Sequence, residues 1–220
     1  MLNCHALCPA LRASVLVALL FAPSPLSGAE GRAALQAAQS PTLIGEAIDA
    51  ADLAAFERLV DTDAILKTAL NLFLREMRKP ETARELPPFL ALMFSGAAGD
   101  TTGGESLRTL LLQEARAFVN NGIASGAFAG RKPSGRTDGF LAPLFADAST
   151  GRKEIREIGE AWPDGKDWLV PFAVHDAGND ERYPVLGRFS PVDKGFRLTA
   201  VENTEDLMRQ IMAEAQNRIE

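Results

Sequence analysis

The chain has 220 residues, of which 46% are hydrophobic and 24% charged, and its formal net charge is −6 at pH 7. This composition is ordinary for a globular protein and excludes compositional disorder, collagen and a small disulfide-stapled scaffold. An acidic chain has no basic field with which to displace counterions from phosphates, so we expect no nucleic-acid partner.

Residues 1–29 have the pattern of a signal peptide. Arg12 precedes the apolar run 13–22, and Ser27-Gly28-Ala29 offers small residues for cleavage after Ala29. A membrane-spanning helix needs about 20 apolar residues, so this run is too short, and no later run is long enough. We therefore predict a periplasmic or secreted protein of a Gram-negative bacterium. The alternative is an inner-membrane protein anchored by an uncleaved leader.

Cleavage of this leader would remove most of the chain's reactive side chains. Cys4 and Cys8 both lie within it, and His175 is the only histidine that follows it. A chain without cysteine has no disulfide, no thiol nucleophile and no thiolate metal site. We accordingly predict no metal, no cofactor and no catalytic residue.

The periodicity of the remaining chain changes twice. We predict a flexible N-terminal segment, 30–40, and then a single domain, 41–220. Helical spacing of apolar residues covers 41–124, glycine, proline and serine predominate in 125–151, and strand-like alternation followed by a helix covers 152–220.

Local signals predict where the helices begin and end. Ser40 is expected to cap a helix that has Pro41 at its first position, and Asp52 and Asp61 are each expected to cap a new helix. The run Asn120-Asn121-Gly122 is expected to end the last helix of this half. The predicted buried stripes are Leu43, Ile44, Ala47, Ile48, Leu53, Phe56, Leu59, Val60, Ile65, Leu66, Ala69, Leu70, Phe73 and Leu74.

The C-terminal third predicts an antiparallel meander of four strands near 154–162, 168–175, 182–190 and 196–201. If each turn closes a hairpin, one face collects most of the apolar side chains. Phe189 is then opposite Phe196 as a cross-strand pair. This face would contain Trp168, Val170, Phe172, Val174, Tyr183, Val185, Gly187, Phe189, Phe196, Leu198 and Ala200. The predicted fold class is α+β, in which a helical N-terminal half packs on the meander and a C-terminal helix closes it.

Two patches carry a resemblance to a known family. The first is Ala47-Ile48-Asp49-Ala50-Ala51-Asp52-Leu53 with Phe56 and Leu59-Val60-Asp61, and the second is Gly195-Phe196-Arg197-Leu198-Thr199-Ala200-Val201. They resemble a family of small exported bacterial proteins that is a domain of unknown function. The resemblance implies a fold and an extracytoplasmic address, not a catalyst. The order of elements is also similar to curved-sheet folds of the cystatin or nuclear-transport-factor type.

The apolar face of the meander is the first candidate site. Trp168, Phe172, Tyr183 and Phe189 could line a pocket for a ligand, although core packing also explains them. If the first strand pairs in register, Glu157 lies beside Phe172, where desolvation would raise its pKa and suit it to acid–base chemistry. A bulge near Gly159 would return Glu157 to solvent.

The opposite face of the meander carries the second candidate site. The same register places Arg188 directly opposite Arg197, and two like charges in that position would suit an anionic partner. A solvated row of charges is the alternative. His175 is expected at a strand end on this face, across from Glu154 and Arg182, where a surface role is favoured over catalysis.

Three classes of function fit these patterns. The leading hypothesis is a periplasmic, non-catalytic module that binds a small apolar ligand or an envelope protein. The second is a pocket enzyme of the curved-sheet type that uses Glu157 as a buried carboxylate, and the third is a structural or assembly accessory. A filled core behind Glu157 would exclude the enzyme. A cavity lined only by apolar groups, or an exposed apolar patch on the helices of 86–119, would favour binding.

Overall fold

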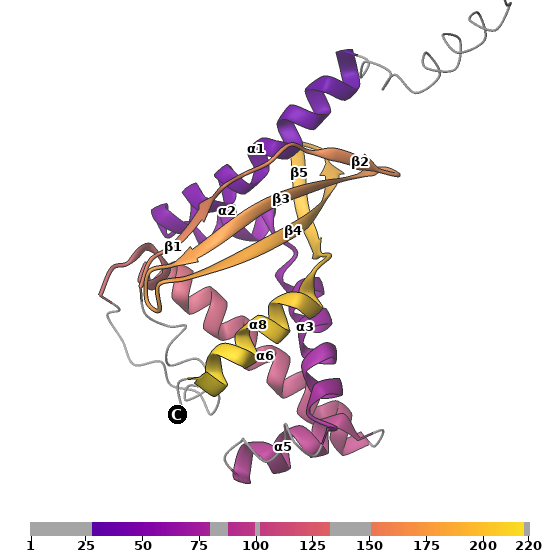
Figure 1. Ribbon diagram of the computed structural model, residues 1–220, viewed down its shortest axis with the longest axis vertical. Helices are drawn as coiled ribbons and strands as arrows, with labels where there is room; N and C mark the ends of the chain where they lie inside the picture. The colour runs from indigo at the N-terminus through magenta and orange to yellow at the C-terminus, as the bar shows by residue number, and fades with distance from the viewer. Residues whose placement is uncertain (1–27, 80–87, 100–101, 133–150, 218–220) are drawn as a thin grey trace, which may run out of the picture. The chain divides into compact units, whose positions relative to one another are not determined.

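A computed structural model describes residues 28–79, 88–99, 102–132 and 151–217 (Figure 1). The predicted signal peptide therefore lies almost entirely outside the described residues, as does the second half of the predicted loop. None of the helices in these ranges combines the length and the apolar character needed to cross a membrane. The chain from Ala33 onward forms one compact unit, and the contacts below are within it.

The predicted α+β class is confirmed, with a helical N-terminal half, an antiparallel sheet and a C-terminal helix. Asp52 and Asp61 are the expected N-caps, because their Oδ1 atoms accept hydrogen bonds from the backbone N–H of Ala55 (2.8 Å) and of Ala64 (3.2 Å). The helices are α1 (Gly28–Ala50), α2 (Leu53–Leu59), α3 (Thr62–Glu76), α5 (Pro88–Ala98), α6 (Thr102–Ala124) and α8 (Thr204–Asn217), with a 3₁₀ turn η1 (Ala127–Ala129).

The prediction that residues 30–40 form a flexible segment is wrong. These residues belong to α1, which continues through Pro41. Ser40 is not a cap, since its hydroxyl donates to the carbonyl of Gln36 (3.1 Å) inside the helix. Ala37, Ser40 and Pro41 are all buried, as is Ile44 one turn later. Burial of this shared face outweighs the hydrogen bond that a proline removes from a helix interior.

The end of the helical half also differs from the prediction. Helix α6 passes through Asn120-Asn121-Gly122 and ends at Ala124. Gly122 is buried there because the ring of Phe128 occupies the space that a side chain would need. Gly126 and Gly130, with φ of 75° and 77°, bound the η1 turn, so the first residues of the predicted loop form a compact return onto α6.

The sheet contains β1 (Lys153–Arg156), β2 (Trp162–Asp164), β3 (Asp167–Asp176), β4 (Glu181–Val192) and β5 (Gly195–Val201). Its order is β1-β3-β4-β5, and β2 pairs with β3 on the same side as β1. The single first strand predicted for 154–162 is therefore two short strands. They are separated at Glu157, whose φ of 53° is left-handed and incompatible with a continuous strand.

The predicted register is confirmed between β3 and β4 and wrong between β4 and β5. Val170 faces Gly187 as expected. Phe189 faces Leu198 instead of Phe196, and a bulge lies between Arg188 and Phe189. A slip of two residues preserves the side-chain parity, so Phe196 and Leu198 still reach the core. Beyond the bulge the parity changes, and Val201 replaces Ala200 on the core side.

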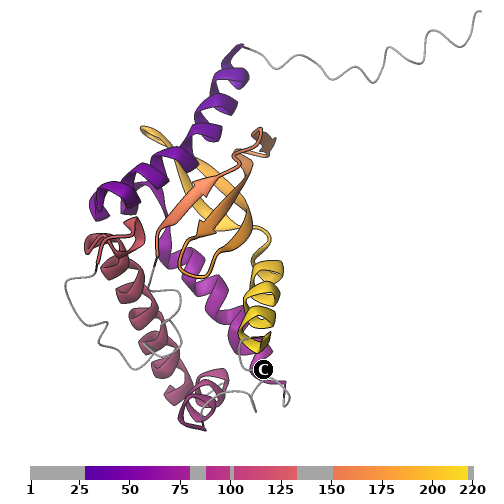
Figure 2. The same cartoon turned by 60° about the vertical axis from the view of Figure 1, so that its left-hand side comes forward.

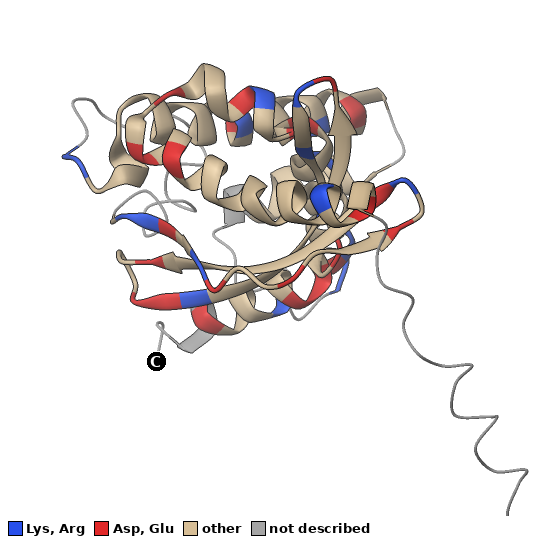
Figure 3. Cartoon of the chain, turned by 90° about the horizontal axis from the view of Figure 1, so that it is seen from above, with Lys and Arg blue, Asp and Glu red and all other residues tan. Residues whose placement is uncertain are grey.

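Helices α1 and α2 and the end of α6 cover one face of the sheet (Figure 2). The main core joins them to it through Ala37, Ile44, Ala47, Ile48, Phe56, Val60, Ile123, Trp168, Val170, Phe172, Val185, Phe189, Phe196 and Leu198. A second cluster holds α3, α5 and α6 together through Leu74, Met77, Phe94, Ala97 and Leu111. Basic and acidic residues are interspersed along the helices and strands (Figure 3).

Candidate functional site

The apolar face of the sheet is a filled core. Val170 and Phe189 are 0% exposed. Trp168 and Phe172 are also buried, and the rings of Phe172 and Phe189 pack at a centroid distance of 6.4 Å. The side chains of α1 and α2 occupy the space that a ligand would need. The predicted pocket on this face is therefore wrong, because the helices pack directly on it.

Tyr183 lies at the margin of this face and is engaged by α8. Its hydroxyl donates to Oε2 of Glu214 and accepts from Nδ2 of Asn179, both at 2.8 Å. Partial burial, followed by the hydrogen bond to Glu214, raises the pKa of Tyr183 to about 12. The hydroxyl therefore stays protonated near neutral pH, and it holds α8 on β4 instead of facing a cavity.

Glu157 is exposed and points away from the core, as the bulge alternative predicted. Nε of Arg182 donates to both of its carboxylate oxygens (2.9 and 3.0 Å), and Nε2 of His175 lies 3.1 Å from Oε1. The hydrogen bonds from Arg182 and then from His175 lower the pKa of Glu157 to about 2. A carboxylate so strongly held in its charged form is a poor proton acceptor at neutral pH. The buried-carboxylate expectation is wrong.

His175 lies where the register predicted, between Glu154 on β1 and Arg182 on β4. Its ring contacts Glu157 across the face of the sheet that is turned away from the helices. In the described ranges, no group of three or more histidine, cysteine or acidic side chains is arranged so that it could hold a metal ion.

Arg188 and Arg197 do not face one another. Arg197 lies opposite Ser190 because the hairpin is shifted by two residues from the predicted register, and the bulge then places Arg188 opposite Ala200. Acidic side chains of this chain surround Arg188: Nε is 2.6 Å from Glu202, Nη2 is 2.7 Å from Asp164, and Nη1 is 3.5 Å from Asp167. These hydrogen bonds, that to Glu202 first, raise its pKa further above its usual value.

Arg197 has a structural role at the junction between α2 and α3. Its Nη2 donates to the carbonyls of Glu57 and Val60 at 3.3 Å, and its Nη1 lies 3.6 Å from Oδ2 of Asp61. A cation at a helix C-terminus satisfies carbonyls that have no partner within the helix. The anion site predicted for the Arg188–Arg197 pair is therefore wrong, because their guanidinium groups serve separate contacts.

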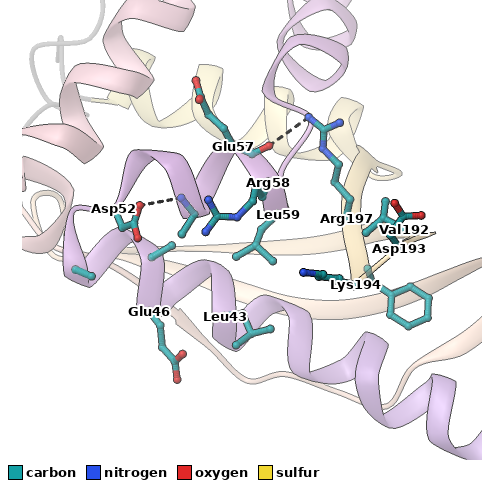
Figure 4. Close-up of a pocket in the computed structure, with 14 residues that line it drawn as sticks. Leu43, Glu46, Asp52, Glu57, Arg58, Leu59, Val192, Asp193, Lys194 and Arg197 are labelled. Carbon is teal, nitrogen blue, oxygen red and sulfur yellow. Dashed lines mark hydrogen bonds between the residues drawn. The ribbon is translucent and has the colours of Figure 1, made fainter.

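A groove of about 910 Å³ lies between α1, α2 and the turn that joins β4 to β5 (Figure 4). Leu43, which is 46% exposed, lines it from α1, and Val192, which is 45% exposed, lines it from the end of β4. Leu59 and Phe196 contribute further apolar surface between them. The other lining residues are Glu46, Ala47, Ala50, Asp52, Ala55, Glu57, Arg58, Asp193, Lys194 and Arg197.

A second, smaller hollow of about 340 Å³ lies on the face of the sheet away from the helices. Trp162, which is 43% exposed, and Leu186 contribute apolar surface, and Glu157 and Arg182 lie at its margin. Its two charged residues are already paired with each other. The larger groove is therefore the stronger candidate, because it combines more exposed apolar surface with Arg58 and Lys194, which form no ion pair within the described ranges.

Comparison with known proteins returned no matching family model, no curated protein and no solved structure.

Sequence reasoning missed the groove. Leu43 has the helical spacing of the buried stripe, and the run Val192-Asp193-Lys194-Gly195 predicts only a turn between two strands. The groove exists because α1 and this turn, which are distant in sequence, lie beside the same edge of the core. The turn signal placed Lys194 at a surface, but nothing in the local pattern placed Leu43 next to it.

Proposed function

We propose that this protein is an exported, non-catalytic binding module that docks a polypeptide segment of an envelope protein in the groove between α1, α2 and the β4–β5 turn. The observation that carries the proposal is the pair of large apolar side chains, Leu43 and Val192, left nearly half exposed in one groove. A protein surface that gathers such side chains in a concavity gains free energy when a partner covers them.

A polypeptide suits this groove better than a small apolar ligand does. Sites for small molecules bury most of the ligand's surface. Here Leu43 and Val192 in the walls are themselves nearly half exposed, and charged side chains line the groove together with the apolar ones. That combination is typical of a protein interface, which has an apolar centre and a polar margin.

Export is supported by the pattern of residues 1–29, and we expect the mature chain to begin at Glu30. N-terminal sequencing of the protein recovered from its own cells, after separation of periplasm, membranes and cytoplasm, tests this. A mature chain found in the periplasm supports the proposal, whereas a full-length chain in the membrane supports the anchored alternative.

Photo-crosslinking tests the groove itself. A benzophenone side chain is placed at Leu43 or Val192, with Leu92 on α5 as the control because it is 74% exposed outside the groove. The proposal expects a protease-sensitive adduct of increased mass from positions 43 and 192 and none from position 92. An adduct of a few hundred daltons that resists protease would instead identify a small ligand, and equal labelling at all three positions would overturn the assignment.

A further inference from the structure

Two basic side chains in the groove form no ion pair with a carboxylate among the residues that the structure describes. Arg58 on α2 and Lys194 at the β4–β5 turn are both exposed, and neither forms an ion pair with a side chain in the described ranges. Several other basic residues of this domain behave differently, since Arg75, Arg152, Arg182 and Arg188 each contact at least one carboxylate.

Basic and acidic side chains around the groove point in different directions. Arg58 and Lys194 extend over the apolar floor formed by Leu43 and Leu59 (Figure 4). The carboxylates of Glu46 and Glu57 point away from it in the same view. That of Asp52 is occupied as a helix cap, accepting from the N–H of Ala55. Asp193, next to Lys194 in the turn, also lines the groove. The groove therefore has acidic residues in its lining, while Arg58 and Lys194 are the basic side chains that lie over its apolar part.

The neighbouring sheet edge restricts how a partner can dock. β5 is the last strand of the sheet, but its outer edge is occupied at Leu198, whose carbonyl accepts from the N–H of Asp61 at 2.8 Å. Val60 also forms an isolated parallel bridge there. An added strand would need those backbone groups. A partner must instead bind through its side chains, as an amphipathic helix does when it lies in a groove.

We propose that the occupant of the groove is an amphipathic helix of an envelope protein, with Asp or Glu residues flanking its apolar stripe. The stripe covers Leu43, Leu59 and Val192, and the flanking carboxylates pair with Arg58 and Lys194. This inference rests on the proposed function and adds the chemistry of the partner to it. Complementary charge at the margin selects the partner, while apolar contact supplies most of the affinity.

Three synthetic helical peptides that share one leucine stripe test this inference. Their flanking positions carry Glu, Gln or Lys, and binding to the purified full chain is measured by fluorescence anisotropy at low and high salt. We expect the Glu peptide to bind roughly three-fold to ten-fold more tightly than the Gln peptide, and the Lys peptide to bind least tightly, as for two exposed ion pairs. High salt should reduce the difference in affinity between the three peptides.

The matched variants are R58Q/K194Q and the control K67Q/K166Q, which removes two exposed lysines outside the groove. The first should abolish the preference for Glu and leave the affinity for the Gln peptide unchanged. The control should preserve the preference. All four substitutions lie at exposed positions, so the fold should be retained, and circular dichroism confirms it.

The outcomes separate the two proposals. Equal binding of all three peptides, or a Glu preference that persists in R58Q/K194Q, overturns the inference about charge and leaves the groove as a binding site. If no peptide binds, the groove does not accept a helix and the inference is overturned, whereas the crosslinking result at Leu43 decides the proposed function independently.

Discussion

The hydroxyl of Tyr183 on β4 donates a hydrogen bond to Oε2 of Glu214 on α8 across 2.8 Å. Glu214 is held in turn by Gln210, whose Nε2 donates to Oε1 at 2.8 Å and to the carbonyl of Arg182 at 3.0 Å. These contacts join the C-terminal helix to the sheet away from the main core. The helix that closes the fold is therefore positioned partly by polar contacts.

This contact predicts that Tyr183 titrates with a raised pKa. Tyr183 is the only tyrosine in the chain, so its ultraviolet titration is unambiguous. We expect a midpoint of about 12 in the folded protein against the ordinary value of 10.0 in the denatured chain. Because the folded pKa is the higher one, the stabilisation linked to this proton is complete below pH 10 and is lost as the pH rises to about 12.

Glu214→Gln provides the control for this titration. It removes the nearby negative charge but keeps an oxygen that can accept the hydrogen bond, so the midpoint of Tyr183 should fall while remaining above its ordinary value because burial persists. A folded midpoint of 10.0 in the unmodified protein would contradict the assigned contact.

The contacts of Glu157 with Arg182 and His175 predict the opposite dependence of stability on pH. Its pKa is lowered from 4.5 to about 2, so its contribution to stability is present above pH 4.5 and is lost as the pH falls to about 2. Glu157→Gln should make the midpoint of urea unfolding less dependent on pH across that window. Glu160→Gln is the control, since Glu160 is exposed and carries the same charge. An equal effect of both substitutions would show that net charge alone is responsible.

The left-handed backbone of Ala51, at the C-terminus of α1, predicts that glycine at this position would stabilise the protein. Ala51 has a φ of 57°, and it ends the helix in a Schellman arrangement, in which Ala51 N–H bonds to the carbonyl of Ile48 and Asp52 N–H to that of Ala47. Glycine adopts this conformation without strain. Ala51→Gly should raise the free energy of unfolding by about 1 kcal/mol. Ala54→Gly, on α2, should lower it by up to about 1 kcal/mol. Urea denaturation measures both, and two changes of the same sign would refute the prediction.

Two helical glycines should respond to alanine in opposite directions. A Cβ at Gly122 would lie 2.3 Å from the ring of Phe128, whereas one at Gly45 would make ordinary contact with Ile155 at 3.7 Å. Gly45→Ala should therefore stabilise the protein by about 1 kcal/mol through helix propensity. Gly122→Ala should destabilise it by about 1–3 kcal/mol through overpacking. Thermal unfolding compares them, and stabilisation by Gly122→Ala would show that α6 does not pack as described.

Much of the fold could be predicted from local patterns. The caps at Asp52 and Asp61 and the pairing of Val170 with Gly187 follow from residue type, turn chemistry and strand alternation. The continuation of α1 through Pro41 could not be predicted, because it depends on tertiary burial that outweighs a local helix-breaking signal.

The candidate site was much less predictable. Glu157 has the spacing of a strand residue, and only the break between β1 and β2 turns it toward Arg182 and His175. The β4–β5 turn pairs Val192 with Gly195, which shifts the hairpin by two residues from the predicted register and places Arg197 opposite Ser190. The bulge then places Arg188 opposite Ala200. A shift of two residues preserves the apolar alternation of a strand, so the pattern does not reveal it, yet it changes which charged side chains lie opposite one another.

The sequence by itself therefore determined the α+β class, the helix caps and the apolar face of the sheet, because periodicity and capping act over a few neighbouring residues. Only the tertiary structure decided that this face is filled, that Glu157 is outside and that Leu43 and Lys194 share one groove. Those relationships join residues far apart in the chain. They arise from how whole elements pack, which no local pattern records.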